Sequence, residues 1–282
     1  MMTFPDLHKD IPHLQRLLAQ RLSRAQDPVQ PQSYALSIQG QPCGHVFTPA
    51  LQTLRTLQDI QIDDGQRRVD LNPSTRTVTE VLADVAVALR ADGRVPFWRD
   101  EQLDVWSKAG QSLGTIERGV TRPLGLLTVA VHLNAWSAQG QLWVARRSLS
   151  KPTDPGRWDN LVGGLVAAGE EGLLALSRET QEEAGLKPAH LAQTSALRNI
   201  VLMRRQLPEG YQREMVQSVS ATLSADARPV NLDGESMTIE CLPISTIIEM
   251  LEEDVFTLAS SLIILDDLLY RALGKAPELP LG

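Results

Sequence analysis

The chain has 282 residues and a formal net charge of −7, from 27 basic and 34 acidic side chains. Hydrophobic residues make up 43% and charged residues 22%, which is typical of a globular protein and excludes collagen-like, disulfide-scaffold and disordered chains. The acidic excess argues against a nucleic-acid backbone as partner. No stretch approaches the roughly 18 apolar residues that a membrane span needs, and the first residues lack the features of a secretory signal. We therefore expect a cytoplasmic protein without membrane contact.

The first part of the chain predicts a small α+β domain, residues 1–118. An amphipathic helix follows Asp10, and a second helix follows the capping box that begins at Thr77. Two hairpins are predicted between these helices, at residues 34–47 and 60–71, with turns at Gly40 and at Asp64-Gly65. Glycine and proline cluster at residues 117–125, which places a domain border there.

The second part, residues 119–282, alternates apolar β-rich segments with helical patterns. A hairpin is expected around Gln139-Gly140, and a helix over 170–184 ends at Gly185. Strands and helices interspersed in this order predict an α/β fold with a mixed sheet between helices. The further strands are expected at 197–204, 214–223 and 237–242, and the further helices at 244–252 and 256–273.

The helix over 170–184 carries the most informative pattern in the sequence. Glu179, Glu182 and Glu183 have the spacing i, i+3, i+4, which places three carboxylates on one helical face. Three glutamates alone are typical of a solvated acidic face. Glycines before and after the helix, at 163–164 and 185, instead indicate a strand–loop–helix unit that presents the carboxylates at a fixed place. Oxygen ligands of this kind suit Mg²⁺ or Mn²⁺.

The stretch from Gly164 to Leu186 resembles the Nudix hydrolase box, G-x5-E-x7-R-E-U-x-E-E-x-G-U, where U is aliphatic. Thr180 is its one departure from the pattern. The resemblance implies a Nudix α/β/α sandwich behind the small α+β domain, and a metal-dependent hydrolase of organic diphosphates. It implies Glu179, Glu182, Glu183 and the Gly164 carbonyl as metal ligands, with Glu170 and Arg178 orienting the carboxylates. Arg178 is counted with the three glutamates as part of the catalytic set.

Looser matches outside the box resemble a two-domain subfamily, the Nudix proteins of fungi and plants related to thiamine pyrophosphokinase-associated proteins. These matches include residues 98–101, 142–148, 155–164 and 233–235, with Lys151 between the second and third stretches. The resemblance implies thiamine diphosphate, or its damaged oxy and oxo analogues, as the small-molecule substrate. A homodimer is compatible with it.

Several residues near the box are candidates for substrate contacts. Arg146, Arg147 and Lys151 follow a strand and could meet phosphate oxygens, or could simply be solvated. Trp158 could stack on a substrate ring or pack in the core. The remaining candidates are His132 as a core residue, Asp159 and Asn160 as loop anchors, Glu214 or Glu235 as the general base, and Trp98, Arg99 and Glu101 as either a cleft lining or a tie between the domains.

Three other functions fit the same fold. The first is a Nudix hydrolase that acts on nucleoside diphosphate derivatives instead of thiamine compounds. Isopentenyl diphosphate isomerases resemble residues 146–160, but they use a cysteine shortly afterwards, where this chain has Leu161 and Val162. Cys43 and Cys241 are out of register and are expected to be small core residues. A non-catalytic Nudix module that binds an effector is the third alternative, although all box glutamates are present.

Overall fold

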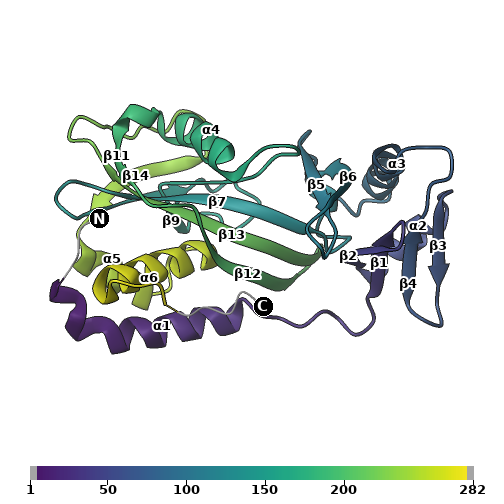
Figure 1. Cartoon of the computed structure of the whole chain (residues 1–282), viewed down its shortest axis with the longest axis horizontal. Helices are drawn as coiled ribbons and strands as arrows, with labels where there is room; N and C mark the ends of the chain where they lie inside the picture. The colour runs from purple at the N-terminus through teal and green to yellow at the C-terminus, as the bar shows by residue number, and fades with distance from the viewer. Residues whose placement is uncertain (1–4, 278–282) are drawn as a thin grey trace.

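The computed structural model describes residues 5–277. The molecule is elongated, with a small module at one end and a larger sheet covered by helices on both faces (Figure 1). We call residues 34–117 the small module and residues 127–273 the large module. The N-terminal helix lies outside the small module, along the far end of the large one (Figure 1).

The small module contains a four-stranded sheet with strand order β2-β1-β4-β3 and a separate hairpin of β5 and β6. Strands β1 and β2 turn at Gly40, and the capping box of Thr77 and Glu80 begins helix α3, as predicted. The β5–β6 hairpin was not predicted. The elements are η1 (Pro5–Asp10), α1 (Ile11–Arg24), β1 (Tyr34–Ile38), β2 (Gln41–Val46), η2 (Thr48–Ala50), α2 (Leu51–Leu54), β3 (Ile60–Asp63), β4 (Arg68–Leu71), α3 (Val78–Ala91), β5 (Gln102–Trp106), β6 (Ser112–Glu117) and η3 (Arg118–Val120).

The large module is built on an eight-stranded mixed sheet. Its central strand, β7 (Leu127–Trp136), pairs in parallel with β13 over ten residues. The same strand pairs in antiparallel with β8 and β10. The predicted helix over 170–184 begins two residues later and ends at Gly185, whose φ of 62° is the left-handed helix cap. The elements are β7 (Leu127–Trp136), β8 (Leu142–Arg147), β9 (Trp158–Asn160), β10 (Val162–Leu165), α4 (Gly172–Ala184), η4 (Pro188–His190), β11 (Leu191–Thr194), β12 (Arg198–Leu207), β13 (Gly210–Leu223), β14 (Ser236–Leu242), α5 (Ile244–Glu252) and α6 (Leu258–Leu273).

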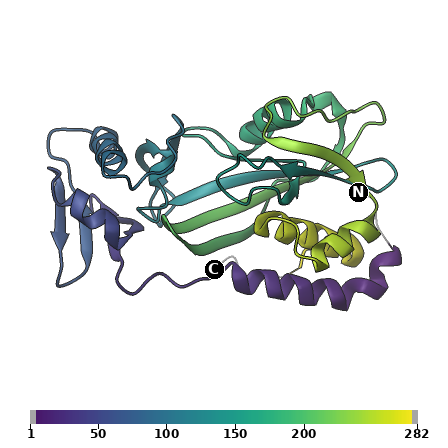
Figure 2. The same ribbon diagram turned by 180° about the vertical axis from the view of Figure 1, so that it is seen from behind.

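The sheet is sandwiched between helix α4 on one face and helices α1, α5 and α6 on the other (Figures 1 and 2). This arrangement confirms the predicted mixed sheet between helices. Among the helices that the structure describes, none is long and apolar enough to cross a membrane.

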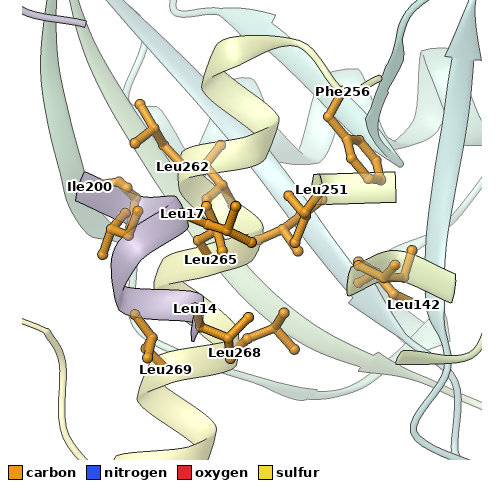
Figure 3. Packing of buried hydrophobic residues seen from close by; sticks show 14 of the residues in the cluster. Leu14, Leu17, Leu142, Ile200, Leu251, Phe256, Leu262, Leu265, Leu268 and Leu269 are labelled. Carbon is orange, nitrogen blue, oxygen red and sulfur yellow. The ribbon is translucent and has the colours of Figure 1, made fainter. Parts of the chain in front are cut away.

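Helix α1 belongs by packing to the large module. Leu14 and Leu17 are buried against α6 and lie in one apolar cluster with Ile200 and Leu265 (Figure 3). Arg21, also buried, donates to the carbonyl of Leu251 at 2.6 Å. The division at residues 118 and 119 stays a prediction about independent folding, but α1 contributes to the core on the far side of that division.

The two modules are joined by backbone hydrogen bonds at the end of the large sheet. The amide of Ala168 donates to the carbonyl of Gln102 at 2.8 Å, and the amide of Gly169 donates to Asp104 Oδ2 at 2.8 Å. Strand β5 therefore holds the loop that precedes helix α4. A change in the small module can reach the acidic helix through this contact.

Candidate active site

Strand β10 lies against helix α4, and two glycines permit the close approach. The Gly163 amide donates to Glu183 Oε2 at 2.9 Å. A Cβ on Gly164 would lie 2.1 Å from Glu179 Oε1, and a Cβ on Gly163 would lie 2.5 Å from His132 Nδ1. A larger residue at either position would force Glu179 or His132 to move, so the glycines keep both side chains in place.

Arg178 connects the carboxylates of the box. It donates to both oxygens of Glu170, at 3.1 and 3.0 Å, and to Glu179 Oε1 at 2.8 Å. It also donates to Glu182 Oε2 at 3.2 Å and to the Leu165 carbonyl at 3.4 Å. These bonds lower the pKa of Glu170 and raise that of Arg178. The guanidinium thus fixes the rotamers of three glutamates, as a positioning residue would.

The three box glutamates differ in their environment. Glu182 is 55% exposed, whereas Glu179 is 14% exposed and Glu183 is also largely buried. Burial raises the pKa of Glu179, and it raises the pKa of Glu183 to about 8. Like charge adds to both shifts, because each carboxylate has acidic neighbours. The charged forms of Glu179 and Glu183 would therefore be stabilised by additional positive charge nearby.

A cavity of about 530 Å³ opens beside this helix, between the large module and the end of the small one. We call it the central cavity. All the box carboxylates that were predicted as ligands line it, with Gly164 and Arg178. Its lining also includes Arg99, Glu101, Arg118, Arg122, His132, Arg147, Lys151, Asp159, Met203, Arg205, Gln212, Glu214, Asp233, Glu235 and Leu258.

A second set of carboxylates meets Glu183 from the loop before β14. One oxygen from each of Glu183, Asp233 and Glu235 lies within 4.8 Å of the others, and no other trio of metal-ligating side chains in residues 5–277 is as close. Lys151 forms an ion pair with Glu235. The box spacing could not reveal this group, because Asp233 and Glu235 come from a loop 50 residues later.

The predicted substrate-contact residues separate into two pairs. Arg147 and Lys151 line the central cavity, and Arg147 donates to Asp159 Oδ2 at 2.7 Å. Arg146 is exposed outside the cavity lining and donates to the Gly156 carbonyl. Trp158 packs on the core that contains α6, also outside that lining. Arg146 points away because neighbouring residues on a strand face opposite sides of the sheet.

The two candidates for the general base both line the central cavity. Glu214 on β13 accepts from Thr128 Oγ1 and from Gln212 Nε2, each at 3.1 Å. Glu235 is occupied by the ion pair with Lys151. His132, predicted as a core residue, is buried and also borders the cavity; burial lowers its pKa.

Residues 118–126 connect the small module to the large one, and we call them the linker. The small module and the linker supply site residues that the Nudix box did not indicate. Buried Glu117 accepts from the amides of Arg99 at 2.8 Å and Glu101 at 3.2 Å, which shapes the segment between them. Arg118 donates to Glu101 Oε2 at 2.7 Å. Trp98 instead bonds to Asp100 and does not line the cavity. The sequence left open whether this segment lines a cleft or ties the two domains together, and both arrangements are present in the structure.

Comparison with known families identifies both parts of the chain. The NUDIX domain model matches residues 126–257, and a model named domain of unknown function (DUF4743) matches residues 16–128. Residues 126–257 thus match a Nudix domain. This finding confirms the predicted Nudix fold behind an N-terminal α+β domain. Nudix hydrolases act on pyrophosphate-containing substrates and generally use divalent metal ions.

Curated relatives extend across both parts. Nudix hydrolase 24, chloroplastic, of Arabidopsis thaliana is 28% identical over 86% of this chain and 68% of its own length. Nudix hydrolase 20, chloroplastic, of the same plant is 28% identical over 71% of this chain and 54% of its own length. An isopentenyl-diphosphate Delta-isomerase of Streptomyces avermitilis is 33% identical over 34% of this chain and 49% of its own length. This chain thus spans between about half and two thirds of these relatives.

Proposed function

We propose that this chain hydrolyses the pyrophosphate bond of a small organic diphosphate, with a divalent ion at the Nudix box. The observation that supports this most directly is the shared central cavity, which brings the box glutamates and Gly164 together with Arg147 and Lys151. A cavity of about 530 Å³ is large enough for a small-molecule substrate.

The donors present fit a hard cation. Glu179, Glu182, Glu183 and the Gly164 carbonyl supply only oxygen, which Mg²⁺ and Mn²⁺ prefer. Desolvated carboxylates with raised pKa values are stabilised by added positive charge. When bound, the ion supplies charge neutralisation at the phosphate oxygens and lowers the pKa of water.

The side chains around these ligands have separate tasks in this proposal. Arg178 positions the carboxylates, while Arg147 and Lys151 bind phosphate oxygens. Glu214 or Glu235 accepts the proton of the attacking water. Glu214 has no cation attached to it in the described chain, whereas Glu235 must first release Lys151.

At a finer level, we propose thiamine diphosphate or its damaged analogues as substrates. The aromatic wall expected from Trp98 and Trp158 is not at this cavity. An adjoining cavity of about 130 Å³ is lined by two aromatic side chains, Phe97 and Tyr211. Arg99 and Arg118 line both cavities and disfavour the cationic ring of the intact cofactor. An oxo analogue with a neutral ring meets no such repulsion.

Gln212 offers a means of discrimination. The residue is 8% exposed, and its buried Oε1 atom has no hydrogen-bond partner within residues 5–277. A substrate with an amino group can satisfy this acceptor, and an analogue with a carbonyl in that place cannot. We therefore rank the oxo analogue, which retains the amino group, above the oxy analogue.

A phosphate-release assay with Mg²⁺ or Mn²⁺ tests the proposal. The panel contains thiamine diphosphate, its oxy and oxo analogues, ADP-ribose and a nucleoside triphosphate, compared by kcat/KM. Metal-dependent release from any diphosphate, abolished by chelator, supports hydrolysis. A tenfold or larger preference for ADP-ribose or a nucleotide removes the thiamine proposal and leaves the hydrolase. Ligand binding with no turnover on the whole panel supports the non-catalytic module instead.

The isomerase alternative receives no support from the cavity. Neither Cys43 nor Cys241 is among its lining residues, and Leu161 is buried. The homodimer and the cytoplasmic location stay predictions. Light scattering at several protein concentrations would establish the oligomeric state.

A further inference from the structure

The central cavity is lined by an unusual number of cations, and most of them are paired. Arg178 bonds to the box glutamates, Arg147 to Asp159, and Lys151 to Glu235. From the linker, Arg118 pairs with Glu101 and Arg122 pairs with Glu209. These five side chains therefore have their charge balanced within the protein.

Arg99 and Arg205 differ from the other five. Within residues 5–277, neither guanidinium forms an ion pair or a hydrogen bond, although both line the central cavity. Arg99 comes from the segment before β5, and its guanidinium lies 5.8 Å from the centre of the Phe97 ring. Arg205 comes from β12 and faces the cavity with Met203, two residues earlier on the same strand.

Arg99 has like charges beside it and no carboxylate bonded to it. Burial and the neighbouring guanidiniums of Arg118 and Arg122 lower its pKa, and the nearby carboxylates of Glu101 and Glu117 offset part of this shift. Within residues 5–277 neither carboxylate bonds to the guanidinium, so its charge-assisted hydrogen bonds are available to an anionic ligand in the cavity that it lines.

We propose that Arg99 and Arg205 form an anion-binding subsite of the central cavity that holds a phosphate group of the substrate. The small module would then supply a substrate contact, beyond holding the loop before α4. This inference rests on the proposed function only for the identity of the ligand as a diphosphate.

The Nudix box and the two unpaired arginines border the same cavity. Glu179, Glu182 and Glu183 line it together with Arg99 and Arg205. Glu101, which accepts from Arg118, lines the same cavity. A phosphate near the box and a second phosphate at Arg99 and Arg205 would complement both sets of side chains.

The test measures binding of methylenediphosphonate, a diphosphate analogue that cannot be hydrolysed, in excess chelator by calorimetry. Without a divalent ion, the box glutamates repel this anion, so its binding depends on the cations alone. Arg99→Gln and Arg205→Gln are compared with Arg146→Gln, which removes the same charge from an exposed site outside the cavity. Arg99→Lys keeps the charge but loses the planar set of donors.

We expect at least tenfold weaker binding for Arg99→Gln, several-fold weaker binding for Arg205→Gln and Arg99→Lys, and less than twofold change for Arg146→Gln. Thermal melting of each variant checks the fold; Arg99→Lys serves if Arg99→Gln does not fold. Binding within twofold of the unmodified chain in the Arg99 and Arg205 variants, or equal weakening in Arg146→Gln, overturns the subsite. If binding follows this pattern but the phosphate-release assay detects no turnover of any diphosphate in the panel, the subsite is supported and the proposed hydrolase is removed.

Discussion

The two sides of the central cavity arise in opposite ways. The box ligands on the acidic side come from one helix, α4, and the strand before it, so they lie within 20 residues of one another. The cationic side collects Arg99 from the small module, Arg118 from the linker and Arg205 from β12. The acidic residues were found from their spacing, whereas the cationic residues have no spacing to find. Local sequence can encode a metal-binding face, but a site between modules requires the fold.

The largest effect is expected on the acidic side. Glu183→Gln or Glu182→Gln should lower kcat by roughly a hundredfold or more, because each removes an anionic ligand. The melting temperature in chelator should hold, since a glutamine at position 183 can still accept from the Gly163 amide and Glu182 is mainly exposed. Steady-state kinetics with Mg²⁺ and a thermal melt provide the measurement, with exposed Glu171→Gln as control. Full activity in both variants would show that the box does not hold the ion.

Helix α1 contacts neither side of the cavity, and we expect it to affect stability alone. Leu14→Ala should lower the free energy of unfolding by about 2–5 kcal/mol, because Leu14 is fully buried against α6. Activity at a temperature where the variant is folded should stay within twofold. Val87→Ala, at a 62% exposed site on α3, is the matched control.

By the same argument, a fragment of residues 119–282 should be unstable and prone to aggregate, although it retains every box ligand. A stable fragment, or a Leu14 variant with normal stability, would contradict this assignment of α1.

The pKa of Glu183 predicts a pH effect of intermediate size. Burial raises it from 4.5 to about 8, so the folded, metal-free protein binds this proton more tightly than the unfolded chain. The resulting contribution to stability is complete below pH 4.5 and is lost as the pH rises toward about 8. Divalent ions need the carboxylate, so their affinity should increase over the same range. Urea denaturation in chelator and Mg²⁺ titration, each from pH 5 to 9, measure the two trends. Glu183→Gln should reduce the first slope; an unchanged slope would show that another group is responsible.

The smallest effect is expected for Arg146, the strand residue that faces away from the central cavity. Arg146→Gln should change kcat/KM by less than twofold, because its guanidinium bonds to the Gly156 carbonyl outside the cavity. Arg147→Gln, the adjacent position on the cavity side, should reduce kcat/KM by tenfold or more through lost phosphate binding. Kinetics with one diphosphate substrate compares the two directly. Equal losses in the two variants would mean that the strand alternation does not separate their roles.

The sequence alone determined the elements with strong local signals. The turn at Gly40, the capping box at Thr77 and the helix cap at Gly185 each depend on neighbouring residues, and each lies where it was predicted. The three box glutamates share a face of α4 for the same reason, since a helical period relates them. Their gathering at a cavity with Gly164 also follows from local packing.

Only the tertiary structure decided what faces these elements. It packed α1 on α6, brought Asp233 and Glu235 to Glu183, and placed Arg99 and Arg205 at the same cavity. It also excluded Arg146 and Trp158 from that cavity. These outcomes depend on strand register and on contacts between segments far apart in the chain. The sequence pattern within one segment carries no information on which distant segment packs against it.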